Sequence, residues 1–155
     1  MALYLSIQVR HGVSSAPIQM EGWAEGRSGP VDQPRLVTLW SGAPRHSLLR
    51  LSLEPAGGSL NAIASSGSLH YFRWADATLR PLPAEATVSL ARGDAYVALT
   101  SEAQRVGSPA IARFVHLRDY FNAERLAAGI LDFLASESGQ TAFKEDVAAL
   151  VVEAR

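Results

Sequence analysis

The stretch 86–103 constrains the fold more than any other part of the chain, because two alternating apolar runs flank a glycine turn within it. The runs cover 86–90 and 95–100, and Arg92-Gly93-Asp94 separates them. Alternation with a period of two is typical of half-buried strands, and Gly-Asp is typical of a connection between them. The stretch predicts strand, tight turn and strand, followed by a polar loop at 101–103. Loops at strand ends often carry functional residues.

The chain before this stretch has the same strand character. Residues 46–82 are typical of a meander of antiparallel strands, because short strands with regular turns favour an antiparallel sheet over βαβ units. Gly and Pro between 26 and 34 predict a loop. The remaining patterns predict strands at 3–9, 18–24, 35–40, 46–54, 60–65, 69–74 and 78–80.

Helical spacing of apolar residues replaces alternation after residue 103. It predicts helices at 109–120 and 123–136, with Asn122 as the N-cap of the second helix. The run 147–152 is apolar without alternation, which is typical of a strand buried on both faces. The sequence therefore predicts an α+β fold: antiparallel β-sheet layers with two helices from the C-terminal half packed on them.

Length and composition bound the class of protein. The length favours a single domain over residues 1–155. Hydrophobic residues make up 48% and charged residues 19%, which is typical of a globular chain. The net charge of −1 provides no basic field, so we expect neither nucleic acid nor an anionic membrane surface as a partner.

The sequence also constrains the cellular compartment in which we expect the protein. The chain contains no cysteine, which excludes disulfides and thiolate metal sites and is compatible with the cytoplasm. The N-terminus is typical of a first strand and not of a signal peptide, and no apolar run approaches the ~18 residues of a membrane span. We expect a cytoplasmic protein. Because Arg155 directly follows the last predicted strand, we expect any neighbour at that end to be a separate chain.

Four pieces of the chain occur in an order that points to a known family. Residues 49–83 contain strand, turn, strand, short glycine turn and strand, and residues 90–103 contain Gly-Asp, a strand and Ser-Glu-Ala. The helix at 123–136 follows, and Glu145-Asp146 then precedes an apolar strand. Together the pieces resemble the SpoIIE-like and RsbX-like bacterial branch of the metal-dependent protein phosphatases of the 2C type (PPM). The resemblance covers 46–155 and implies a trimmed phosphatase β-sandwich.

The resemblance implies a metal centre in catalytic members of the family, where two Mg²⁺ or Mn²⁺ ions hold a water that attacks a phosphoserine or phosphothreonine. Such ions need several carboxylate oxygens. Here Asp146 matches the last acid of the family's Asp-Asp pair, and Glu102 stands where the family has the Asp of Ser/Thr-Asp-Gly. The early Asp motif and the two helices after it are missing. We therefore predict a non-catalytic relative (a pseudophosphatase) without catalytic residues or a cofactor, with Asp146 and Glu102 as candidate metal ligands.

Other interpretations remain open. Asp146 can instead be a turn residue that precedes the final strand. An active Mn²⁺- or Mg²⁺-dependent phosphoserine/phosphothreonine phosphatase is the alternative function, and it needs a further acid from the N-terminal third. An accidental resemblance would leave an unassigned α+β binding domain. The four histidines are scattered without metal-ligand spacing. The N-terminal acids that are candidates for the alternative are Glu21, Glu25 and Asp32.

Three tryptophans, Trp23, Trp40 and Trp74, lie in or next to predicted strands. Most such residues fill cores, but an exposed group on one sheet face would anchor a protein partner. They are therefore candidate partner-binding residues. The predicted function is contact with a protein partner, either a regulatory partner or a second copy of the chain, in a bacterial regulatory system.

Overall fold

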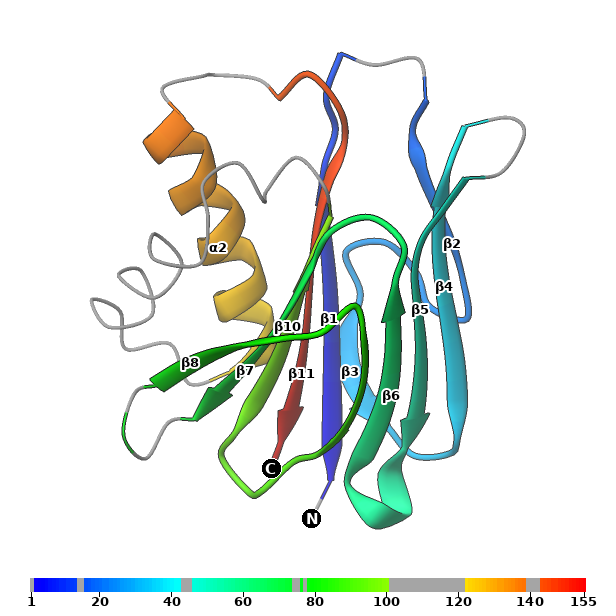
Figure 1. The fold of residues 1–155 in the computed structure, drawn as a ribbon, viewed down its shortest axis with the longest axis vertical. Coiled ribbons are helices and arrows are strands. Elements are labelled where there is room, and N and C mark those ends of the chain that lie inside the picture. Colours follow the sequence, from blue (N-terminus) through cyan, green and yellow to red (C-terminus); the bar gives the residue numbers. More distant parts are fainter. Residues whose placement is uncertain are drawn as a thin grey trace.

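The computed structural model describes residues 2–13, 16–42, 46–73, 76, 78–100, 122–138 and 143–155, with the side chains of 137 and 138 left out. These residues form eleven strands, one α-helix and one short 3-10 helix at Pro55–Gly57. The strands form two antiparallel sheets that face each other as a sandwich (Figure 1).

Each sheet has its own strand order. The six-stranded sheet runs β3 (Ser28–Val31), β1 (Leu3–Arg10), β11 (Val147–Ala154), β10 (Ala95–Leu99), β7 (Ser68–Arg73) and β8 (Thr78–Leu82). The five-stranded sheet runs β2 (Ile18–Glu21), β4 (Arg35–Ser41), β5 (His46–Glu54), β6 (Ser59–Ala64) and β9 (Glu85–Ser89).

The main core lies between the two sheets. In most strands every second side chain points into it, which is the consequence of the alternating pattern. Burial of these apolar side chains removes their surface from water and supplies most of the stabilisation of the sandwich. The core includes Leu5 and Ile7 of β1, Leu39 of β4, Leu51 of β5 and Tyr96 of β10.

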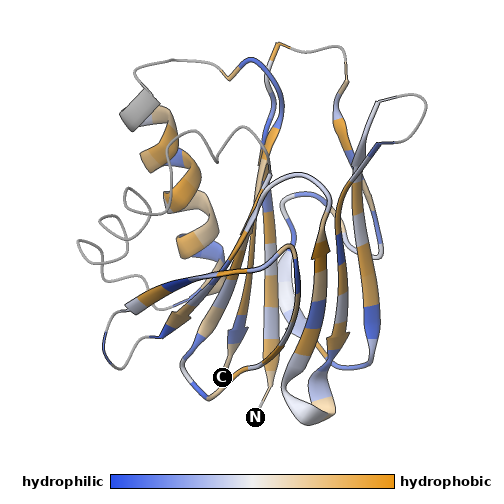
Figure 2. Ribbon diagram, in the orientation of Figure 1, coloured by the Kyte–Doolittle hydropathy of each residue, from blue (hydrophilic) through white to orange (hydrophobic). Residues whose placement is uncertain are grey.

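A second core lies on the other face of the six-stranded sheet, under α2 (Ala123–Ser138). Leu126, Ile130 and Leu134 of the helix pack against this face together with Val97 and Val151. In Figure 2, α2 lies beside this sheet and is coloured mostly as hydrophobic. All residues of β11 are buried, which confirms the predicted strand with two buried faces.

The predicted N-cap and the fold class are also confirmed. The Asn122 side-chain oxygen accepts a hydrogen bond of 2.8 Å from the Arg125 amide, as an N-cap residue does. The described residues form an α+β sandwich with α2 on one sheet. The other predicted helix, at 109–120, lies outside the described residues.

The predicted connection between strands is wrong in one place. Residues 46–82 are not one meander: the chain leaves the five-stranded sheet after β6, adds β7 and β8 to the six-stranded sheet, and returns as β9 beside β6. The predicted strand, tight turn and strand at 86–100 are confirmed as β9, the turn at 92–94 and β10, and the two strands belong to different sheets. Gly93 has a φ of 90° there and its amide donates to the Ala154 carbonyl. Alternation fixes which face of a strand is buried, but not the sheet that the strand joins.

One strand was missed in the predicted loop at 26–34. Residues Ser28–Val31 form β3, which pairs with β1 at the edge of the six-stranded sheet. Pro30 argued against a strand, but an edge strand tolerates proline because one side of it needs no partner. The second predicted strand is shorter than expected and ends at Glu21, because Gly22 turns the chain with a φ of 86°.

Candidate functional site

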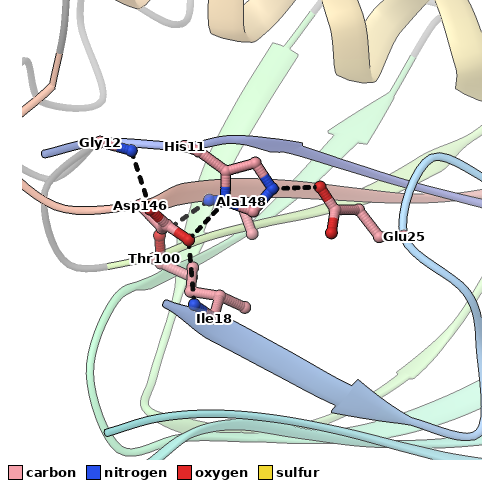
Figure 3. A network of polar contacts seen from close by, with 7 residues as sticks. All are labelled: His11, Gly12, Ile18, Glu25, Thr100, Asp146 and Ala148. Atoms are coloured by element: carbon pink, nitrogen blue, oxygen red, sulfur yellow. Dashed lines mark hydrogen bonds and ion pairs between the residues drawn. The ribbon is translucent and has the colours of Figure 1, made fainter. Parts of the chain in front are cut away.

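Three segments meet at one end of the sandwich: the end of β1, the start of β2 and the residue before β11 (Figure 3). Gly12 lies so close to the loop before β11 that a Cβ atom there would be 2.5 Å from the Glu145 carbonyl. Glycine is therefore required at this approach. The Val13 amide donates to the Phe143 carbonyl at 3.2 Å, which ties the same two segments. The candidate ligand Asp146 lies at this junction.

Both carboxylate oxygens of Asp146 accept hydrogen bonds. Oδ1 accepts from the Gly12 amide at 2.8 Å, and Oδ2 accepts from the Ile18 amide at 3.0 Å. Nδ1 of His11 lies 2.7 Å from Oδ2. The side chain of Asp146 is only 3% exposed. It therefore joins β11 of one sheet to β2 of the other through backbone amides.

The pKa of Asp146 reflects this environment. Burial alone raises a carboxyl pKa, because it penalises the charged form. The hydrogen bonds from the Gly12 and Ile18 amides and from His11 outweigh burial, so the pKa of Asp146 lies below its ordinary value. Asp146 is an ionised carboxylate at neutral pH.

His11 lies between two carboxylates. Nδ1 contacts Asp146, and Nε2 lies 2.7 Å from Oε1 of Glu25. The hydrogen bond to Asp146, followed by that to Glu25, raises the pKa of His11 against a smaller opposing contribution from burial. An imidazole that donates from both nitrogens is an imidazolium, so the chain Asp146–His11–Glu25 favours one positive charge between two negative ones.

Thr100 and a small cavity complete the junction. Thr100 follows β10, and its hydroxyl accepts a hydrogen bond of 3.0 Å from the Ala148 amide of β11. A cavity of about 60 Å³ lies beside Asp146. This volume has room for a few water molecules. The cavity is lined by Ala16, Ile18, Ser41, Leu48, Thr100, Glu145 and Asp146.

The predicted metal ligands are only partly placed by the structure. Asp146 lies at the junction, whereas Glu102 lies outside the described residues. Of the N-terminal acids, Glu25 reaches Asp146 only through His11. Over the residues that the structure describes, no group of three His, Cys, Asp or Glu side chains is arranged to hold a metal ion.

His11 is the residue that sequence reasoning missed. It was one of four scattered histidines, and its partners lie 135 and 14 residues away in the sequence. Its position directly after the first strand was the only local signal. The pairing itself depends on how β1, β2 and β11 meet in space.

Two of the three candidate partner-binding tryptophans are buried. Trp23 and Trp40 are each 6% exposed, so they offer little surface to a partner. The Trp23 indole donates to the Arg27 carbonyl at 3.0 Å, with the Arg27 guanidinium 4.1 Å from the ring centroid. The Trp40 indole donates to the Gln19 side chain at 3.0 Å. These residues fill the fold and satisfy their N–H groups. Trp74 lies outside the described residues.

Solved structures with a similar fold are phosphatase domains. The PP2C phosphatase domain of SpoIIE from Bacillus subtilis, solved with a fragment of its regulatory domain, matches with a TM-score of 0.67 and 11% identity over 99% of this chain and 64% of that chain. The serine/threonine phosphatase PstP/Ppp of Mycobacterium tuberculosis matches with a TM-score of 0.63 and 10% identity over 100% of both chains. RsbX in complex with magnesium matches with a TM-score of 0.64 and 10% identity, over 98% of this chain and 95% of that chain.

No family model and no curated protein matches this sequence. The structural matches define the class by fold alone, since the identities are 10–11%. The chain has the fold of PP2C-type (PPM) phosphatase domains, in a short form of 155 residues, as the sequence resemblance predicted. It spans 64% of the SpoIIE chain. None of the helices in the described residues has the length and apolar character needed to cross a membrane.

Proposed function

We propose that this protein is a non-catalytic phosphatase-like module of the bacterial cytoplasm that acts through contact with a protein partner or with a second copy of itself. One observation carries the proposal: both carboxylate oxygens of Asp146 already form hydrogen bonds, with Gly12, Ile18 and His11. The acid that the family resemblance offers as a metal ligand has a structural role at the junction of the two sheets.

The physical cost of using Asp146 as a metal ligand supports this proposal. Its carboxylate accepts hydrogen bonds from two backbone amides, and an ion that displaced either of them would leave a buried amide without an acceptor, at a cost of about 1–3 kcal/mol. In its protonated form, which the two carboxylates favour, His11 beside Asp146 would also repel the ion. Glu25, the acid on the other side of His11, is paired with His11 as well.

The relatives support the regulatory part of the proposal. SpoIIE is a cell fate determinant whose phosphatase domain accompanies a regulatory domain. A domain of this fold that loses catalysis keeps its surfaces, and those surfaces can still bind the proteins that a regulatory system contains.

The alternative is an active Mn²⁺- or Mg²⁺-dependent phosphoserine/phosphothreonine protein phosphatase. RsbX has a similar fold and was solved with magnesium, which favours this alternative. In that case Asp146 and Glu102 would supply carboxylates, and the cavity beside Asp146 would hold the attacking water.

Calorimetric titration with Mn²⁺, combined with a phosphopeptide turnover assay, tests the proposal. We expect no saturable binding at millimolar Mn²⁺ and no metal-dependent turnover. Binding of about two ions per chain, lost in Asp146→Asn together with turnover, would establish the phosphatase instead. Glu54→Gln is the control, because Glu54 is an exposed acid at the end of β5 and is not one of the candidate ligands.

A further inference from the structure

A groove opens at the side of the sandwich where the chain passes from β8 to β9. Within the described part of the chain these two strands are the edges of their sheets on this side, because β8 pairs there only with β7 and β9 only with β6. In Figure 1, β7 and β8 fan away from the strands of the other sheet. The groove has a volume of about 350 Å³ and is lined by Tyr71, Arg73, Thr78, Arg80, Leu82, Thr87, Val88 and Ser89.

The groove carries positive charge without acids in its lining. Arg80 has no carboxylate partner among the described residues, and its guanidinium lies 5.6 Å from the centroid of the Tyr71 ring. The Tyr71 hydroxyl donates to Asp94 at 2.6 Å, which holds the ring in place under Arg80. Arg73 contacts Asp76 at 2.9 Å, but both side chains are about half exposed. Such an exposed pair is weak and can exchange for another carboxylate.

On the side of the groove, the backbone of β9 pairs with no other strand among the described residues. At the two ends of the β6–β9 pair, the Ala64 amide donates to the Ala84 carbonyl at 2.7 Å and the Leu90 amide donates to the Gly58 carbonyl at 2.9 Å. Antiparallel strands bond through every second residue pair, so this register fixes the direction of all groups between them. The N–H and C=O groups that point away from β6 are those of Glu85, Thr87 and Ser89.

The edge strand on the other side of the groove, β8, is less suited to pairing with an added strand. Pro81 lies in the middle of β8 and lacks an N–H group. Proline at a sheet edge blocks the addition of a further strand. Within the groove, β9 is therefore the strand that can accept one.

We propose that this groove binds an extended acidic segment of a partner protein, which adds as a strand to the free edge of β9 and places carboxylates on Arg73 and Arg80. The inference rests on the proposed function as a protein-interaction module and names the chemistry of its partner. Main-chain hydrogen bonds to β9 supply affinity in this mode of recognition, and the two arginines supply selectivity.

The positive charge of the groove favours an acidic segment of a partner, and not a second copy of this chain, as the molecule that binds there. Pairing of two copies through β9 would bring two sets of Arg73 and Arg80 to one interface. Like charges across an interface are unfavourable, whereas glutamates at alternate positions of an added strand match the arginines. The volume of the groove suits the side chains of a short segment.

Fluorescence anisotropy with synthetic peptides tests the proposal on the full chain. The probe is a labelled dodecapeptide that alternates Thr or Val with Glu, and the matched control peptide replaces each Glu by Gln. We expect saturable binding of the Glu peptide at micromolar concentrations, weaker binding at higher salt, and at least about tenfold weaker binding of the Gln peptide.

Three variants locate the site. Arg80→Gln should weaken binding of the Glu peptide by about tenfold or more. Thr87→Pro removes one N–H that points away from β6 and should abolish strand addition while leaving the β6 ladder intact. Arg50→Gln is the control, because Arg50 is an exposed arginine of β5 and does not line the groove, and it should bind as the wild type does.

Equal affinity for both peptides, or unchanged affinity in Arg80→Gln and Thr87→Pro, would overturn the groove as the site. A dimer that Thr87→Pro converts to a monomer would show that a second copy is the occupant instead. The result of this experiment can be separated from that of the metal titration. If the protein binds neither Mn²⁺ nor either peptide and shows no turnover, the proposed function stands and only this inference is overturned.

Discussion

The two sheets of the sandwich differ in how many of their faces are buried. The six-stranded sheet has the main core on one face and α2 on the other, so β10 and β11 are buried along their whole length. Among the described residues, the five-stranded sheet has a core on one face only, and β9 alternates buried and exposed residues. Its other face leaves Leu36 46% exposed and Ile63 37% exposed.

The difference shows how a sequence encodes the layers of a fold. A strand that is covered on both faces needs apolar residues at nearly every position, as in VAALVV, whereas a strand with one wet face needs them at every second position. Apart from Leu36 and Ile63, the outer face of the five-stranded sheet has mostly polar residues, among them Thr38, Ser52 and Asn61. Residues of this kind need no covering layer, so the phosphatase-like sandwich can exist in a short form.

The largest expected effect comes from a charge placed on the covered face. Val151→Asp puts a carboxylate between β11 and α2, where Val151 is fully buried. A buried charge without a partner costs several kcal/mol, so we expect a loss of at least about 4 kcal/mol in the free energy of unfolding. Urea denaturation followed by circular dichroism measures it, and failure to fold is the extreme of the same result.

Leu36→Asp is the matched substitution on the outer face of the five-stranded sheet, which the described residues leave exposed at this position. Its position is exposed and opposite Ser52, so we expect a loss of about 1 kcal/mol or less. A comparable loss in both variants would mean that the outer face of the five-stranded sheet is covered as well, and the contrast between the sheets would fail.

An intermediate effect is expected where the two sheets are joined. Asp146→Ala leaves the amides of Gly12 and Ile18 without their acceptor. Each unsatisfied buried amide costs about 1–3 kcal/mol, and we expect a loss of about 2–4 kcal/mol in the free energy of unfolding. Equilibrium denaturation in urea measures this loss.

Asp146→Asn sharpens the interpretation, because it keeps one oxygen acceptor and loses the charge that pairs with His11. We expect its stability to lie between those of the wild type and Asp146→Ala. If both variants were as stable as the wild type, Asp146 would not have the structural role proposed here, and the metal-ligand interpretation would gain support.

Much of the fold could be predicted from local patterns. The strand at 147–152, the helix after Asn122 and most other strands follow from periodicity and capping, which act over a few residues. Sheet membership could not be predicted in the same way. The crossings between sheets at 66–67 and 92–94 depend on which core each alternating face joins, and that is a property of the whole chain.

The candidate site was less predictable than the fold. Asp146 was identified from its place before an apolar strand, but its hydrogen bonds go to Gly12 and Ile18, far away in the sequence. His11 and Glu25 had no motif at all. A carboxylate that binds backbone amides across a fold leaves no fixed spacing in the sequence, whereas the family's motifs for metal ligands do.

The smallest expected effect is the pH dependence of the stability that His11 and Asp146 contribute at the junction of the two sheets. The pKa of His11 is raised above its ordinary value of 6.5, so its contribution to stability is fully present below 6.5 and is lost as pH rises through the pKa in the folded state. The pKa of Asp146 is lowered from 3.8, so its contribution is present above 3.8 and is lost as pH falls through its pKa in the folded state. The two contributions overlap fully between 3.8 and 6.5.

Thermal unfolding of the wild type and of His11→Gln between pH 4 and 9 checks the direction in which the contribution of His11 to stability changes with pH. The wild type should exceed the variant by no more than about 2–4 °C in Tm at pH 5, because the side chain of His11 is 55% exposed and solvent screens its ion pairs. The difference should shrink at alkaline pH, since a neutral imidazole cannot donate to both Asp146 and Glu25. If the difference in Tm grew with pH instead, His11 would be neutral in the folded state. The charge of Asp146 would then not be paired with a positive charge on His11.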